Sequence, residues 1–203
     1  MNMIRAALVG LGLVCASSPT AQVSLDDLDR AMDSRSDQMA AFRDRLNDPD
    51  PNRAMTAMQL LITKGDTQQK QMAIEHGLSS TNPAIRMAAV TAVFDSQPIL
   101  VSRWYPEERD FNNNFRNRVK HFRGTINADK SARVPLAVGQ YSEDAKCWVD
   151  LRESRYCLFR INSGEISIRM DGWAQVALDD SGRLMGTPMI GGYRTEVVID
   201  LGR

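Results

Sequence analysis

Few residues of this 203-residue chain have the types and spacings that catalysis or metal binding requires. The two histidines, His76 and His121, have no cysteine or second histidine at the separation typical of zinc ligands. No serine sits in a Gly-x-Ser-x-Gly turn. Gly191-Gly192 falls between expected strands rather than before a helix, where phosphate-binding loops occur. The sequence therefore predicts no metal and no cofactor, and it favours a protein without catalytic activity.

Carboxylates are the remaining candidates for catalysis. Glu165, Asp171, Asp179 and Asp180 could converge in space and act as the acid–base pair of a polysaccharide hydrolase, although nothing in their spacing selects two of them. The string from Asp179 to Gly182 also offers oxygen ligands for calcium, but it is typical of a turn between strands. An envelope hydrolase acting on polysaccharide is therefore an alternative function.

Four aromatic residues give the best indication of a binding surface. Trp148, Tyr156, Trp173 and Tyr193 lie close to expected turns in the second half of the chain. Exposed aromatic rings stack on sugars or anchor a protein partner. The competing interpretation is that Trp148 packs against a disulfide and Trp173 fills the core. We take the four as candidate ligand-binding residues, with an envelope protein or a glycan as the ligand.

The amino terminus has the pattern of a secretion signal. Arg5 precedes an apolar run, and small residues follow as far as Ala21. The run is too short to span a hydrocarbon core of ~30 Å. We expect a signal peptide over residues 1–21 and a periplasmic or secreted protein, with no stable membrane insertion after the signal is removed. Cys15 follows Val14, whereas a lipoprotein signal has a small residue there.

Removal of the signal leaves two cysteines, Cys147 and Cys157. The segment between them is expected to form a hairpin with its turn near Arg152, which places the two cysteines opposite each other on adjacent strands. Cross-strand neighbours lie about 4.5–5.5 Å apart, within reach of a disulfide. An even number of cysteines in an exported chain favours the same pairing.

Charge disfavours nucleic acid as a partner. Lys plus Arg number 25 and Asp plus Glu number 25, with no strongly basic run. Proteins that bind nucleic acid through phosphates usually have a basic excess or a basic face.

A further alternative for the function is a small inhibitor of a secreted enzyme.

Helical periodicity extends over residues 25–94. Apolar residues recur at intervals of three, four and seven from Leu25 to Leu46, and a helix is expected from Pro51, with Asp50 as its cap. The sequence then repeats with an offset of 32 residues, so that Asn82-Pro83 matches Asp50-Pro51. Five further pairs at the same offset support the repeat: Leu46 with Leu78, Met55 with Met87, Ala57 with Ala89, Met58 with Val90, and Leu61 with Val93.

A period in the low thirties with a cap-proline start is typical of stacked helix pairs. Asn82-Pro83-Ala84-Ile85-Arg86 resembles the linker of HEAT repeats, and Asp50-Pro51-Asn52-Arg53 is similar, with its arginine one place early. The resemblance covers about residues 46–94. It implies antiparallel helix pairs and a role in protein binding, or alternatively a helical cap on the second half.

The second half changes to period-two alternation. We treat residues 95–121 as a connecting region in which Phe111, Phe115, Val119 and Phe122 fit one face of a short helix. Short strands separated by tight turns are expected over residues 122–203, with no motif that links them to a known family. The sequence thus predicts an α+β protein, a short helical-hairpin repeat followed by an antiparallel β-sandwich or small barrel. The function it favours is that of an exported binding or interaction protein.

Overall fold

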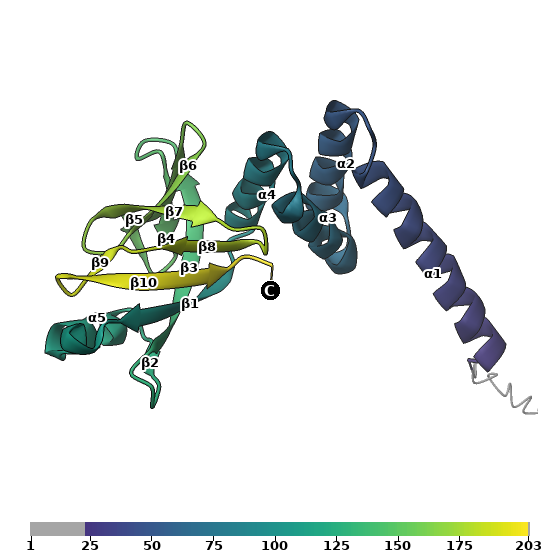
Figure 1. Ribbon diagram of the computed structural model, residues 1–203. Coiled ribbons are helices and arrows are strands. Elements are labelled where there is room, and N and C mark those ends of the chain that lie inside the picture. Colours follow the sequence, from purple (N-terminus) through teal and green to yellow (C-terminus); the bar gives the residue numbers. More distant parts are fainter. Residues whose placement is uncertain (1–22, 203) are drawn as a thin grey trace, which may run out of the picture. The chain divides into compact units, whose positions relative to one another are not determined.

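The computed structural model describes residues 23–202 of the chain (Figure 1). The chain divides into two compact units, residues 1–38 and 39–203. The signal peptide expected over residues 1–21 lies outside the described residues. Within residues 23–202 no helix combines the length and the apolar character needed to cross a bilayer.

Helix α1 (Leu25–Leu46) begins in the first unit and ends in the second. Ser24 starts it, since its hydroxyl accepts a hydrogen bond from the Asp27 N–H at 3.1 Å. The apolar stripe expected along this helix divides into two parts. Its first three members, Leu25, Leu28 and Met32, are exposed, whereas Met39 and Leu46 are buried and Phe42 is half-buried.

The second and fourth helices start where the sequence predicts, at Pro51 and Pro83. Asp50 and Asn82 have the same extended backbone, with φ −83° and ψ 112° in one and φ −83° and ψ 115° in the other. Each side chain accepts a hydrogen bond from the N–H two residues ahead, at 2.9 Å. Proline follows each cap in the first helical turn. The three helices that follow α1 are α2 (Pro51–Lys64), α3 (Thr67–Ser79) and α4 (Pro83–Asp95).

Gly77 lies inside α3, which continues to Ser79. The reason for a glycine is close packing between helices. A Cβ at position 77 would lie 2.6 Å from the Ala89 Cβ and 2.6 Å from the Met58 Sδ. The absence of a side chain therefore lets α3 approach its neighbours.

The remainder of the second unit is a closed antiparallel β-barrel, one of the two architectures that the sequence predicts. The ring runs β1-β3-β4-β5-β6-β7-β8-β10 and closes where β10 pairs with β1 (Figure 1). Short strands β2 and β9 pair with β3 and β10. The strands are β1 (Ile99–Pro106), β2 (Thr125–Ile126), β3 (Ala132–Ser142), β4 (Cys147–Asp150), β5 (Glu153–Asn162), β6 (Glu165–Arg169), β7 (Trp173–Leu178), β8 (Arg183–Gly186), β9 (Met189–Ile190) and β10 (Tyr193–Asp200).

Strand β1 lies in the segment 95–121 that we interpret from the sequence as a connection. It pairs with both β3 and β10, so it belongs to the barrel and closes it. Ser102 interrupts the apolar alternation that would have identified the strand. Its buried hydroxyl donates to the Val134 carbonyl at 3.0 Å. The expected short helix in the same segment is α5 (Asn113–His121).

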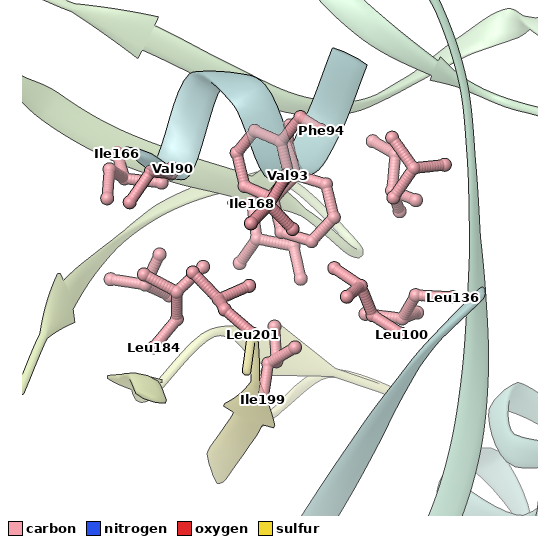
Figure 2. Close-up of a cluster of buried hydrophobic side chains, with 14 of the residues drawn as sticks. Val90, Val93, Phe94, Leu100, Leu136, Ile166, Ile168, Leu184, Ile199 and Leu201 are labelled. Atoms are coloured by element: carbon pink, nitrogen blue, oxygen red, sulfur yellow. The ribbon is translucent and has the colours of Figure 1, made fainter. Parts of the chain in front are cut away.

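One hydrophobic core joins the helices to the barrel. Val90, Val93 and Phe94 of α4 lie among Ile166, Ile168, Leu184 and Leu201 of the barrel (Figure 2). The Phe94 ring stacks on Phe159 at 4.5 Å between centroids and meets Trp148 edge-on at 5.2 Å. At the other end of β1, Phe115 and Phe122 lie edge-on to Trp104 at 6.4 and 5.6 Å. The helical part and the barrel are therefore not separate domains with a boundary near residue 94.

The structure confirms the disulfide between Cys147 and Cys157, which have a Cα–Cα distance of 5.7 Å. The strands carry bulges, so the ladder pairs Val149 with Cys157 rather than the two cysteines. A disulfide that closes a loop of this length is expected to stabilise the fold by about 2–3 kcal/mol.

We predict that Gly77→Ala destabilises the protein by about 1–2 kcal/mol. Alanine normally stabilises a helix interior by about 1 kcal/mol relative to glycine. Here the new methyl would overlap Ala89, which has no flexible side chain to move away, and overpacking costs about 1–3 kcal/mol. Urea unfolding measures the change. Gly172→Ala is the control, since nothing lies within 4 Å of a Cβ at that position, and a more stable Gly77→Ala variant would contradict the packing argument.

Candidate functional site

The four aromatic residues expected to bind a ligand do not form one surface. Trp148 is buried, with 5% of its surface exposed, and its Nε1 donates to Asp95 Oδ1 at 2.9 Å. Its ring contacts Phe94 and Tyr141. Trp148 therefore belongs to the core that seats α4 in the barrel, close to the competing interpretation made from the sequence.

Tyr156 lies near the α5 end of the barrel, where its ring is 6.4 Å from that of Phe122. Its hydroxyl donates to the carbonyl of Met170 at 2.7 Å and lies 3.0 Å from that of Arg169. Burial raises the pKa of this hydroxyl, so it stays protonated and remains a donor. The Arg169 guanidinium lies over the same ring at 5.2 Å.

Trp173 pairs with Arg169 in the β6–β7 register and is half-buried beneath the Arg160 guanidinium, 4.3 Å from its ring centroid. Tyr193, at the start of β10, is 39% exposed. Tyr156 and Trp173 therefore flank Arg169, while Trp148 and Tyr193 take no part in that group of contacts.

Each candidate catalytic carboxylate lies within hydrogen-bond or ion-pair distance of another group of the protein. Glu165 accepts from the Gln175 amide at 2.6 Å. Asp171 Oδ1 lies 2.8 Å from Arg118 Nε, and its Oδ2 accepts from the Gly192 N–H at 2.9 Å. These contacts tie strand ends and turns together.

The string from Asp179 to Gly182 is the turn between β7 and β8, as the sequence suggests. Burial raises the pKa of Asp179, but hydrogen bonds from the Arg183 backbone and side chain and from the Ser181 N–H outweigh it and hold the pKa below its usual value. Asp180 is fully exposed. Among residues 23–202 the structure has no group of three or more His, Cys, Asp or Glu side chains able to hold a metal ion.

Arg86, near the start of α4, attaches this helix to that same turn. Its Nη2 donates to the carbonyls of Leu178 at 2.9 Å and Asp179 at 2.7 Å. Carbonyl oxygens at the end of a strand otherwise need water or another donor. Arg86 therefore has a role in docking that the sequence did not suggest.

A second polar cluster lies under α5. Asp150 is buried and accepts from the Arg152 N–H, Nε and Nη2 at 2.8, 2.9 and 2.6 Å. Arg152 Nη1 also donates to the Phe122 carbonyl at 3.1 Å. Burial would raise the pKa of Asp150, but the hydrogen bonds from Arg152 outweigh it and hold that pKa below its ordinary value. This cluster attaches the end of α5 to the β4–β5 turn.

A concave surface lies between α2 and α4. This α2–α4 groove has a volume of about 530 Å³. All but one of its lining residues fall into pairs related by the 32-residue offset of the repeat. The pairs are Thr56 and Ala88, Gln59 and Thr91, Leu60 and Ala92, and Thr63 and Asp95, with Ile62 as the ninth lining residue.

The lining of the α2–α4 groove is more apolar than its residue types suggest. Thr56, Thr63 and Thr91 each donate their hydroxyl to the carbonyl four residues earlier, at 2.8, 2.8 and 2.9 Å. They therefore need no hydrogen bond from a ligand. Leu60 is 51% exposed at the edge of the groove. Short side chains between two helices leave room for close approach by another polypeptide.

Sequence reasoning missed this groove. Thr56, Gln59 and Thr63 are typical of a solvated helix face, and Ala88 and Ala92 are typical of a core. The offset of 32 residues was the available signal, because equivalent positions of two repeat copies lie on equivalent faces.

We predict that Asp150→Asn lowers the free energy of unfolding by about 1.5–3 kcal/mol at pH 7, the range for hydrogen bonds to charged groups. The pKa of Asp150 is lowered in the fold, so its stabilisation is complete above the unfolded value of about 3.9 and is lost as the pH falls through the lower folded value. Urea unfolding from pH 7 into this acid range should show the difference between the two proteins shrinking. A difference that does not change with pH would rule out the ion pair as its source.

Comparisons of the chain with family models, with curated proteins and with solved structures found no match.

Proposed function

We propose that this is an exported interaction protein without catalytic activity that binds a partner polypeptide in the α2–α4 groove. The observation that carries the proposal is the lining of that groove by equivalent residues of two repeat copies. Two similar helices, each started by a cap and a proline, present matched stripes of short side chains. An apolar face of a helix is a suitable ligand for such a groove.

The chemistry of the α2–α4 groove favours a polypeptide ligand over a glycan. Aromatic rings on which sugars would stack are not among the lining residues, and the groove offers only two polar groups that do not bond within their own helix, Gln59 and Asp95. Asp95 Oδ1 is taken by Trp148. A lysine or arginine of the partner would pair with the exposed carboxylate at this end, while small or aliphatic residues contact Leu60 and Ala92.

Contacts elsewhere support a binding protein over a hydrolase. The side chains of α4 and α5 occupy the barrel ends, and its interior is packed with apolar residues. The carboxylates proposed for hydrolysis are held in turns and ion pairs. The disulfide is compatible with an oxidising compartment, which supports export to the periplasm or beyond.

Export is tested on protein recovered from cells that make the full chain. The expected intact mass is that of a chain beginning at Gln22, with both cysteines resistant to thiol reagents until a reductant is added. Retention of residues 1–21 together with two free thiols would refute export.

Binding is tested by placing a photo-crosslinking amino acid at Leu60, on the edge of the groove, in the exported protein. We expect a discrete crosslinked product whose yield falls by about tenfold or more in Ala92→Arg, because the long side chain would occupy the groove and exclude the partner. Ala84→Arg is the control, since it adds the same side chain on an exposed position of α4 outside the groove. Equal yields in the two variants, or no product at all, would refute binding in the groove.

A further inference from the structure

Three arginines from three strands meet around one small hollow on the outer wall of the barrel. Arg103 of β1, Arg133 of β3 and Arg183 of β8 line it together with Val101, Val198 and Asp200. The volume of this arginine hollow is about 140 Å³. Pockets for drug-sized ligands usually begin at about 300 Å³. The arginine hollow can therefore admit a small ion, or one group of a larger molecule.

Two of the arginines face each other directly. Arg103 pairs with Arg133 in the antiparallel register of β1 and β3. Like charges in this position repel and destabilise a sheet. In the part of the chain that the structure describes, neither guanidinium has a hydrogen bond, an ion pair or an aromatic contact. No hydrogen bond or ion pair from residues 23–202 therefore offsets the repulsion between these two guanidiniums.

The other charged groups of the hollow leave it positive. Arg183 Nη2 lies 2.8 Å from Asp179 Oδ2, and Asp200 lies opposite Arg183 in the backbone register of β8 and β10. Three guanidinium groups and two carboxylates give a net charge of +1. The excess positive charge lies on the side of the hollow formed by Arg103 and Arg133.

We propose that the arginine hollow binds a phosphate-type oxyanion. Guanidinium groups stay charged at every relevant pH and donate pairs of hydrogen bonds to oxyanions. A tetrahedral phosphate can accept from guanidiniums that approach from different strands, whereas a planar carboxylate is satisfied by one or two. The volume fits the anionic group alone, so a phosphate ester would keep its organic part outside. Both free phosphate and the headgroup of a phospholipid surface carry this group.

The first test uses inorganic phosphate and the isotope-labelled full-length mature protein, at an ionic strength held constant with sodium chloride. The NMR signals of the Arg103 and Arg133 Nε–H groups should shift and saturate. Arg103→Gln with Arg133→Gln should weaken the affinity by about tenfold or more. Arg155→Gln is the control, because Arg155 is also an exposed strand arginine without a protein partner among the described residues. Shifts that do not saturate, or that are equal in both variants, would overturn the proposal.

The second test separates the two sources of the anion and does not depend on the α2–α4 groove. Vesicles of phosphatidylglycerol with phosphatidylcholine are compared with phosphatidylcholine alone in a sedimentation assay. Binding to the anionic vesicles that the double variant loses would assign a lipid headgroup, and saturable binding of inorganic phosphate alone would assign the free ion. Failure in both arms would overturn the proposal.

Thermal unfolding gives an independent check on the double variant. Without phosphate and at low salt, its melting temperature should be equal to or above that of the natural protein, because the cross-strand repulsion is gone. Added phosphate should raise the melting temperature of the natural protein and of Arg155→Gln, but not that of the double variant. A phosphate effect common to all three would contradict a site at the arginine hollow.

Discussion

The burial of helix α4 in the mouth of the barrel is the constraint on which the rest of the second unit depends. Phe94 lies among barrel residues such as Ile168 (Figure 2) and is fully buried. Its ring is stacked on Phe159 and edge-on to Trp148. The polar contacts of the same helix reinforce this position, since Arg86 binds the β7–β8 turn and Asp95 accepts from the Trp148 indole. One face of α4 is thereby fixed by apolar burial, and the opposite face, which lines the groove, is fixed with it.

The repeat explains how such a short helical segment can be stable. In α2, the apolar residues Met58 and Leu61 belong to the core. The equivalent residues of α4, Val90 and Val93, also belong to it, but they lie beside barrel residues such as Ile168 (Figure 2). Stacked helix pairs need a neighbour on each side to bury their faces. The barrel provides that neighbour for α4, so two copies suffice where a free-standing array would need more.

Local patterns in the sequence predicted the elements that local chemistry decides. The starts of α2 and α4 follow from a cap and a proline, and the disulfide follows from a hairpin between two cysteines. Strand β1 was missed because Pro98 and Pro106 bracket it and Ser102 points inward, so its period-two signal is weak. Its place in the barrel depends on pairing with β10, almost a hundred residues later in the chain, which no local pattern reports. The groove was missed because its threonine hydroxyls bond within their own helices, and this makes polar residue types serve as apolar surface.

The aromatic residues show why residue type alone did not locate the site. A tryptophan near a turn can bind a ligand or fill a core, and Trp148 is used by the core because α4 covers it. The same holds at the other end of β1, where Trp104 meets Phe115 and Phe122 of the α5 segment. Because both ends are occupied in this way, a ligand inside the barrel would have to displace these large aromatic side chains. Removing one such side chain from a core lowers the free energy of unfolding by about 3–5 kcal/mol. Binding at an outer surface involves no such loss. The barrel is therefore best understood as a rigid support for the two surfaces that we propose as binding sites, the groove and the arginine hollow.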